Sequence, residues 1–191
     1  MKKAKHKRQR NIVLTGASSG IGKELLALFK DIEGVRIIAV ARNIDSIERD
    51  GGVYPFSADL SKQEDVDRMF ECAKSVFGTI DLFIANAGIA YIEEMEKADW
   101  QHLENIYTLN TISAIYSLQK LRDQAMGAPI QFACTISAVA FVPLHGYALY
   151  CSSKAALHQF IEGYRLENND NISITAIYPV ATKTSFFDHA S

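Results

Sequence analysis

Short runs of β-branched and other apolar residues alternate along this chain with longer segments in which apolar residues recur at helical spacing. Strands are predicted at residues 12–14, 36–41, 53–57, 82–85, 130–136 and 172–177. Helices are predicted at residues 20–30, 62–77, 100–124 and 148–166. Strands that are apolar throughout and are separated by helices form a parallel sheet covered on both faces. The pattern therefore predicts a single α/β domain: a Rossmann-like, doubly wound parallel sheet of six strands with helices on both faces.

A glycine-rich turn, Thr15-Gly-Ala-Ser-Ser-Gly-Ile-Gly22, joins the first predicted strand to the first predicted helix. Glycine lets the backbone turn tightly and approach a pyrophosphate without a side-chain clash. The N-terminus of the helix adds free N–H groups and the positive end of its dipole. The turn therefore predicts a dinucleotide site. A G-x-x-x-x-G-K-[ST] phosphate loop is excluded, because five residues separate Gly16 from Gly22 and Glu24 follows Lys23.

Charge is distributed unevenly along the chain. Six of the 20 Lys and Arg residues lie among the first ten, which leaves 14 basic and 22 acidic side chains in the rest, a net charge of −8. A basic tail can attract nucleic acid, but an acidic body offers DNA no second contact area. We expect residues 1–10 to be a solvated basic tail before a catalytic domain at 11–191, with no nucleic-acid partner.

Cysteine, histidine and hydropathy patterns exclude several other classes. The three cysteines and five histidines show no metal-ligand spacing, so no structural metal is expected. No apolar run approaches the roughly 20 residues that span a bilayer. The first ten residues lack the apolar stretch of a secretory signal. We therefore expect a cytoplasmic protein without membrane contact.

Further motifs follow the glycine turn in a set order. Asn86-Ala87-Gly88 follows the fourth predicted strand, Ser137 the fifth, and Tyr150-Cys-Ser-Ser-Lys154 lies on the next helix, with Asn110 on the helix between. This ordered set resembles the short-chain dehydrogenase/reductase family over residues 11 to about 184. The resemblance implies a nicotinamide-dependent oxidoreductase that transfers hydride between cofactor and a carbonyl or alcohol. It implies four catalytic residues: Asn110, Ser137, Tyr150 and Lys154.

Tyr150 and Lys154 are four residues apart and so share one face of a helix. An ammonium beside a phenol favours the phenolate and is expected to lower the tyrosine pKa from its usual value of about 10. Tyr150 is then a general acid/base near neutral pH. By the resemblance, Lys154 also bonds the nicotinamide ribose, Ser137 holds the substrate oxygen, and Asn110 anchors a water on the proton path.

Cofactor preference depends on the end of the second predicted strand. An acidic residue there selects NAD, whereas an arginine suits the 2′-phosphate of NADP. Ala41 and Arg42 occupy this position, so NADP(H) is favoured over NAD(H). The resemblance gives Asp59 to the adenine amino group; the alternative is that Asp59 caps the turn at Ser61. The predicted cofactor-binding residues are Gly16, Ser18, Ser19, Gly20, Ile21, Gly22, Arg42, Asp59, Leu60, Asn86, Ala87, Gly88, Tyr150, Lys154, Pro179 and Thr184.

The sequence departs from the family pattern near its end. Val180 follows Pro179 where the family commonly has glycine, and the chain stops at Ser191, where members usually continue into a substrate lobe. We expect a domain that lacks this lobe. Apolar residues expected near the cleft favour a moderately apolar substrate: Ala90, Tyr91, Phe141, Val142, Leu144 and Tyr147.

Two further expectations come from the resemblance. Helices 100–124 and 148–166 resemble those through which members pair, which predicts a homodimer or homotetramer. The alternative function is a catalytically idle NADP-binding regulatory or scaffolding protein, but such proteins tend to lose the tyrosine or the lysine, and both are present.

Overall fold

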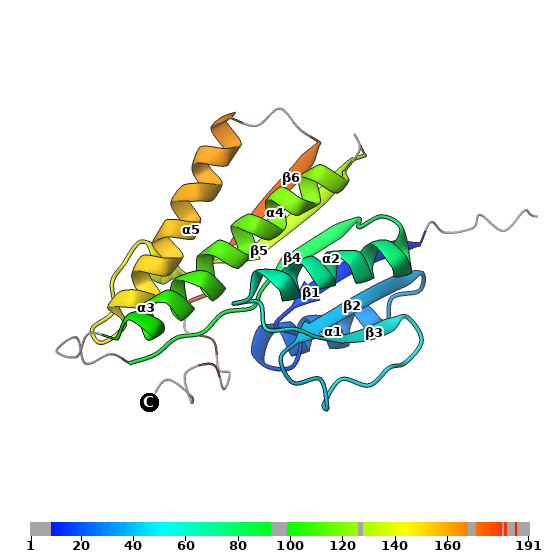
Figure 1. Cartoon of the computed structure of the whole chain (residues 1–191), viewed down its shortest axis with the longest axis horizontal. Coiled ribbons are helices and arrows are strands. Elements are labelled where there is room, and N and C mark those ends of the chain that lie inside the picture. Colours follow the sequence, from blue (N-terminus) through cyan, green and yellow to red (C-terminus); the bar gives the residue numbers. More distant parts are fainter. Residues whose placement is uncertain are drawn as a thin grey trace, which may run out of the picture.

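The computed structural model describes residues 9–92, 99–125, 128–167, 171–180, 182 and 186 of the 191. Strands and helices alternate along the chain, except that β3 follows β2 without a helix between them (Figure 1). The strands are β1 (Arg10–Thr15), β2 (Val35–Ala41), β3 (Val53–Ser57), β4 (Leu82–Ala85), β5 (Ile130–Thr135) and β6 (Ile172–Ile177). The α-helices are α1 (Gly20–Lys30), α2 (Gln63–Phe77), α3 (Trp100–Tyr107), α4 (Ser113–Gln124) and α5 (Ala148–Glu167). Most of the predicted basic tail, residues 1–8, lies outside the described residues.

All six strands form one parallel sheet in the order β3-β2-β1-β4-β5-β6. The chain winds outward from β1 through β2 to β3 and then returns to the other side of β1 at β4. The carboxyl ends of β1 and β4 therefore diverge at a topological switch point, where ligands bind in open α/β sheets. The predicted doubly wound fold is confirmed.

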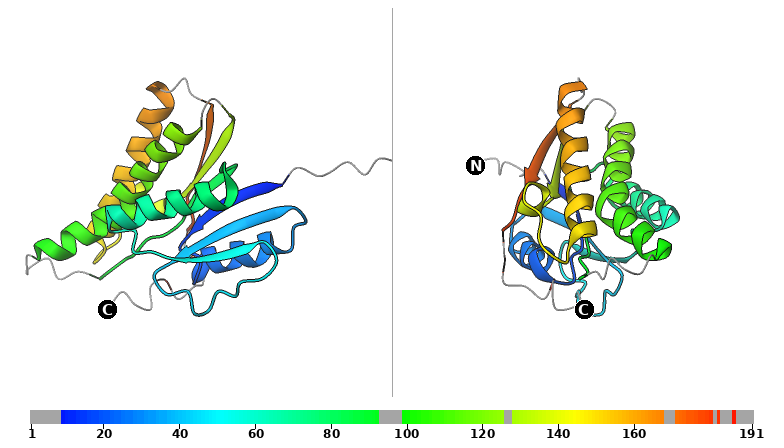
Figure 2. Two further views of the ribbon diagram at one scale, coloured as in Figure 1. Left: turned by 45° about the vertical axis from the view of Figure 1, so that its right-hand side comes forward. Right: turned by 90° about the vertical axis from the view of Figure 1, so that its left-hand side faces the viewer.

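Helices pack on both faces of the sheet, and alternate residues of the strands face each side. Val13 and Ile38 pack against the layer that contains α2, α4 and α5. Ile12 and Ile37 pack on the opposite face, against α1. Figure 2 shows α1 on one side of the sheet and α2, α4 and α5 on the other.

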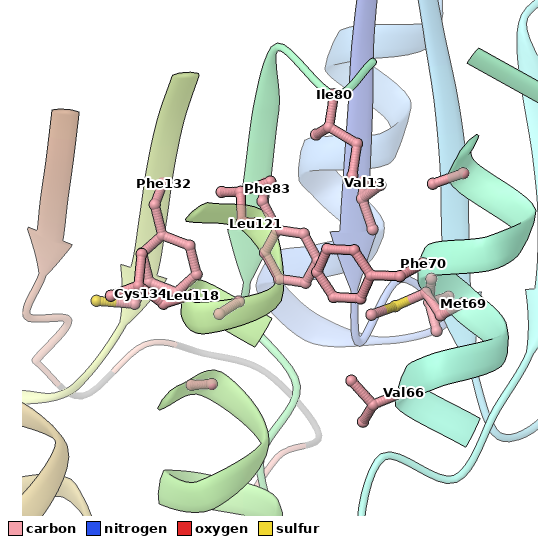
Figure 3. Close-up of a cluster of buried hydrophobic side chains, with 14 of the residues drawn as sticks. Val13, Val66, Met69, Phe70, Ile80, Phe83, Leu118, Leu121, Phe132 and Cys134 are labelled. Atoms are coloured by element: carbon pink, nitrogen blue, oxygen red, sulfur yellow. The ribbon is translucent and has the colours of Figure 1, made fainter. Parts of the chain in front are cut away.

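A row of three aromatic rings forms the centre of the larger layer (Figure 3). Phe83 lies between Phe70 and Phe132, with centroid separations of 5.5 and 5.7 Å and nearly parallel planes. Each offset stack contributes about 1 kcal/mol beyond the burial of its area. Because Phe70 belongs to α2, Phe83 to β4 and Phe132 to β5, the row packs α2 against two neighbouring strands of the sheet.

The prediction that every strand is apolar on both faces is wrong for β5 and β6. Gln131, Ser173, Thr175 and Ile177 are exposed on the face of the sheet that α1 covers elsewhere. In β6 the polar and apolar residues alternate because α5 covers one face, whereas no described helix covers the other.

The predicted single helix over 100–124 is interrupted. A π-helical segment, Thr108–Ile112, separates α3 from α4, and the N–H of Ser113 donates to the carbonyl of Thr108, five residues earlier. The Ser113 hydroxyl also donates to the carbonyl of Leu109 at 2.6 Å. Asn110 lies in the middle of this segment, and π-helical turns are frequent at functional sites.

Candidate functional site

A cleft of about 360 Å³ lies at the carboxyl edge of the sheet, at the switch point between β1 and β4. Most of the predicted site residues line it: Gly16, Ser19, Gly20, Ile21, Asn86, Ala87, Gly88, Ser137, Tyr150, Lys154 and Pro179. The structure thus brings together the glycine turn, the segment after β4, the end of β5 and the first turn of α5. Thr184 lies outside the described residues.

The glycine turn is packed so closely that side chains would not fit. A Cβ on Gly22 would lie 2.0 Å from the carbonyl oxygen of Gly16. Gly16 has φ +68°, and a Cβ there would lie 2.9 Å from the Cα of Ala87. Ser19 precedes α1 without capping it through its side chain. Ser19, Gly20 and Ile21 line the cleft, so the N-terminus of α1 lies at the cleft, where an anion is stabilised by the helix dipole.

Asn86 joins the three strand ends that form the floor of the cleft. Its amide nitrogen donates to the carbonyl of Thr15 at 3.2 Å, and its amide oxygen accepts from the Thr135 hydroxyl at 3.0 Å. The Thr15 hydroxyl accepts from the backbone N–H of Asn86 and of Ala87 at 2.9 and 3.1 Å. These bonds hold the segment after β4 against the glycine turn.

Tyr150 lies on the first turn of α5 and is only 5% exposed. Burial raises the pKa of its phenol, whereas a hydrogen bond with the Ser137 side chain acts in the opposite direction. The expected lowering of the Tyr150 pKa is therefore wrong in direction, because removal from water outweighs the favourable contacts. The hydroxyl keeps its proton at neutral pH.

Lys154 lies one turn further along α5 and is buried, with 3% of its surface exposed. Its ammonium donates to the backbone carbonyl of Thr135 at 2.9 Å. Burial lowers the Lys154 pKa to about 8, and the neighbouring Cys134 acts in the opposite direction. Burial also raises the pKa of the Cys134 thiol to about 11, so this thiol is neutral at pH 7.

The lowered pKa of Lys154 predicts a pH-dependent stability. Between pH 8 and 10.5 the unfolded chain keeps the Lys154 proton that the folded chain has lost, so the free energy of unfolding rises with pH. Cys134 opposes this rise from pH 9, because its thiol ionises in the unfolded state only. We expect the Lys154 contribution to rise by about 1 kcal/mol between pH 8 and 9. Denaturant titrations should show this rise in the wild type and not in Lys154→Met.

The control for this measurement is Lys74→Met, on the exposed face of α2, which removes an ammonium without emptying a buried site. An equal rise in Lys154→Met and in the wild type would contradict the assignment of the low pKa to Lys154.

Asn110 is 1% exposed and does not line the cleft. Its side chain accepts from the N–H of Ile89 and donates to the carbonyl of Ile89, both at 2.8 Å, and it also donates to the Ser153 hydroxyl at 3.0 Å. A Cβ on Gly88 would lie 3.1 Å from the Asn110 amide oxygen. The Asn110 side chain therefore positions the segment after Gly88 beside α5.

Arg42 and Asp59 lie outside the cleft lining, at the ends of β2 and β3. The pKa of Asp59 is lowered. Partial burial by itself raises this pKa, but the hydrogen bonds from Ser61 and the positive charges of Lys62 and Arg42 lower it by more. One Asp59 oxygen accepts from both the N–H and the hydroxyl of Ser61, at 3.1 and 2.7 Å, which is the capping role weighed above.

The three remaining predicted cofactor residues also fall outside the lining. Ser18 is half-buried, Gly22 is buried beneath the turn, and the Leu60 side chain packs in the larger hydrophobic layer. The role of Leu60 in packing reflects its position directly before α2.

Several residues of the site had not been assigned a role from the sequence. Thr135 binds both Lys154 and Asn86, and its place at the end of a predicted strand was the one available signal. Ser153, fully buried, accepts from Asn110 and donates to the carbonyl of Tyr150 at 2.8 Å. Phe186 lies 5.8 Å from the Tyr150 ring, and nothing in the sequence indicated it.

Two structural findings concern other classes of site. Within the part of the chain that the structure describes, no group of three His, Cys, Asp or Glu side chains is arranged to hold a metal ion. Among the described helices, none combines the length and the apolar character needed to cross a bilayer.

A doubly wound sheet with a glycine turn at its switch point defines a dinucleotide-binding α/β protein. The family model for short chain dehydrogenases matches residues 10–191. An uncharacterised oxidoreductase of Staphylococcus saprophyticus is 31% identical over 193 residues, covering 94% of this chain and 77% of that protein. The chain belongs to the short-chain dehydrogenase family and is an oxidoreductase of that type.

Two of the solved structures of similar fold are complexes with different nicotinamide cofactors. The alcohol dehydrogenase of Thermococcus sibiricus, complexed with 5-hydroxy-NADP, has a TM-score of 0.83 and 25% identity, over 94% of this chain and 79% of that one. The 3-ketoacyl-(acyl-carrier-protein) reductase of Brucella melitensis, complexed with NADH, has a TM-score of 0.86 and 25% identity, over 95% and 79%. Similarity alone therefore does not select the cofactor.

Proposed function

We propose that this protein transfers hydride between NADP(H) and a carbonyl or alcohol substrate, with Tyr150 as the general acid/base. The observation that carries the proposal is that Tyr150, Ser137 and Lys154 line the same cleft as the glycine turn. Gly16, Gly20 and Gly88 line the cleft, so the bare backbone there allows the close approach of a pyrophosphate, and a Cβ on Gly16 or Gly88 would press against Ala87 or Asn110.

The residues of the cleft have different roles in the proposed reaction. When bound, the nicotinamide supplies or accepts the hydride. Ser137 holds the substrate oxygen, and Tyr150 donates a proton to it during reduction. The raised pKa of Tyr150 suits this direction, because the phenol is protonated at neutral pH. Lys154, held by the Thr135 carbonyl, would bind the nicotinamide ribose.

NADPH consumption against a panel of aldehydes and ketones tests the proposal. Turnover of one or more of them supports the enzyme. NADPH binding without turnover of any would support the catalytically idle alternative instead.

Preference for NADP(H) is part of this proposal and depends on Arg42. This exposed side chain follows β2, beside the glycine turn that follows β1. Arg42→Ala should weaken NADPH binding by about tenfold or more, because hydrogen bonds to a charged group contribute roughly 1.5–3 kcal/mol. NADH binding should change little. Titration of cofactor fluorescence measures both dissociation constants.

The matched control is Arg49→Ala, an exposed arginine of the same β2–β3 connection whose guanidinium lies over the Tyr54 ring. This variant should leave both dissociation constants unchanged. Equal losses for NADPH and NADH in Arg42→Ala would refute the preference. Pairing into a homodimer or homotetramer through residues 100–124, which form α3 and α4, and through α5 is also part of the proposal.

A further inference from the structure

The cleft has two chemically different ends. The glycine turn and the segment after β4 provide glycines and polar groups at one end, where the dinucleotide is proposed to bind. Near Ser137 and Tyr150, the lining includes the large apolar residues Val139, Val142, Leu144 and Phe186, of which Val139 and Phe186 pack in the same cluster as Tyr150. Apart from Thr182, the other lining residues of the last described segment, Pro179 and Val180, are also apolar. The second end is therefore mostly apolar next to the proposed proton donor.

Tyr150 itself belongs to an apolar cluster. Its ring is buried with Ala90 and Ile106, and Val139 and Phe186 pack against this group. Tyr107 and Leu149 lie at the edge of the same cluster, so the surroundings of the phenol are apolar on more than one side. Of this cluster, Val139 and Phe186 line the cleft beside Tyr150, so they are the members that a carbonyl substrate near the Tyr150 hydroxyl would contact.

Hydrogen bonds fix the wall that carries Val142 and Leu144. The N–H of Leu144 donates to the Cys151 sulfur at 3.4 Å, directly after Tyr150 on α5. The N–H of Val142 donates to the carbonyl of Ala138 at 3.3 Å, and that of Tyr147 to the carbonyl of Leu144 at 3.2 Å. The connection between β5 and α5 is thereby held beside the start of α5, as its path in Figure 1 also shows.

Charge is scarce in this cleft. Among the described residues that line the cleft, Lys154 is the only one that belongs to the types Lys, Arg, His, Asp and Glu. Its ammonium donates to the Thr135 carbonyl. His145 is exposed and is not among the lining residues. Moving a carboxylate or phosphate into such a pocket without a partner is strongly unfavourable.

From these observations we propose that the substrate is an uncharged aldehyde or ketone whose aryl or branched alkyl substituent lies against Val139, Val142, Leu144 and Phe186. This inference rests on the proposed function. In the reduction, the hydride of NADPH forms the new C–H bond, the C=O π pair moves to oxygen, and that oxygen takes the Tyr150 proton. The products are the alcohol and NADP⁺, and solvent returns the proton to Tyr150.

Two ketones that differ by one carboxylate provide the test. Measured by NADPH consumption, kcat/KM for acetophenone should be about 100-fold or more above that for 4-acetylbenzoate. The reason is the cost of burying the unpaired carboxylate, because each tenfold in kcat/KM corresponds to about 1.4 kcal/mol. Leu144→Arg should narrow this ratio by raising the value for 4-acetylbenzoate. Leu28→Arg is the matched control, because Leu28 is 68% exposed near the end of α1 and lies outside the cleft lining, and it should leave the ratio unchanged.

Calorimetric titration of the enzyme–NADP⁺ complex with both ketones separates this inference from the proposed function. Tighter binding of acetophenone without any turnover would support the inference and overturn the function. A wild-type kcat/KM for 4-acetylbenzoate equal to or above that for acetophenone would overturn the inference and leave the function intact. If acetophenone is neither bound by the complex nor reduced by the enzyme, the inference is overturned.

Discussion

Replacing Tyr150 by phenylalanine is expected to lower kcat by about 10²- to 10⁴-fold, the usual contribution of a positioned general acid. Phenylalanine fills the same space among Ala90, Ile106 and Phe186, so the fold and the cleft should persist. NADPH binding should therefore remain within a few-fold of the wild type. Steady-state rates of NADPH consumption and a fluorescence titration of NADPH measure the two effects.

The matched control is Tyr147→Phe. It also removes a tyrosine hydroxyl, but Tyr147 lies three residues before Tyr150 and does not line the cleft. Its kcat should change far less than that of Tyr150→Phe. Equal rates in Tyr150→Phe and the wild type would remove the catalytic assignment while leaving the cofactor site untouched.

The substitution Gly22→Ala should have the largest effect on the fold itself. The added Cβ would lie 2.0 Å from the carbonyl oxygen of Gly16 and 2.8 Å from its carbonyl carbon, and neither backbone atom can move without displacing the turn. Overpacking of this kind costs roughly 1–3 kcal/mol or more. We expect a lower free energy of unfolding, measured by chemical denaturation. We also expect the free energy of NADPH binding to weaken by at least as much as the free energy of unfolding falls.

Gly163→Ala is the control for the chemical change. A Cβ at Gly163, inside α5, would meet nothing within 4 Å. This substitution should stabilise the protein by about 0.5–1 kcal/mol, because alanine loses less conformational freedom in a helix than glycine. If Gly22→Ala were as stable as the wild type and bound NADPH equally well, the close packing of the turn would have no role in the site.

The regular elements could be predicted because their boundaries are local. The bounds of α1, Gly20–Lys30, and of β3, Val53–Ser57, agree with the prediction, since a change of hydrophobic period marks each end. The meeting of the glycine turn with Asn86 and Lys154 also followed from the fold, because the carboxyl ends of parallel strands share one edge of the sheet.

Features that depend on tertiary contacts could not be predicted. The π-helical segment at Thr108–Ile112 lies where Asn110 bonds the backbone of Ile89, a contact that no local pattern indicates. The direction of the Tyr150 pKa shift was missed for a related reason. Helical spacing places Lys154 near Tyr150, but whether burial outweighs the charge depends on side chains from other elements.

The cleft wall likewise contains residues that could be predicted from the sequence and residues that could not. Val142 and Leu144 line it as the sequence suggested, whereas Phe141 packs against His158 and Tyr178, with ring centroids 4.6 and 5.1 Å away. Ala90, Tyr91 and Tyr147 also fall outside the lining. Which residue of an irregular connection faces a cleft depends on the turns within it, and these turns are set by bonds such as that between Leu144 and Cys151.

A crystal structure of the protein with NADP⁺ tests the central claim most directly. The account predicts the pyrophosphate at the N-terminus of α1 and the nicotinamide C4 facing the Tyr150 hydroxyl across a gap that one carbonyl group fills. A nicotinamide ring bound away from Tyr150, or a Tyr150 hydroxyl directed out of the cleft, would contradict it.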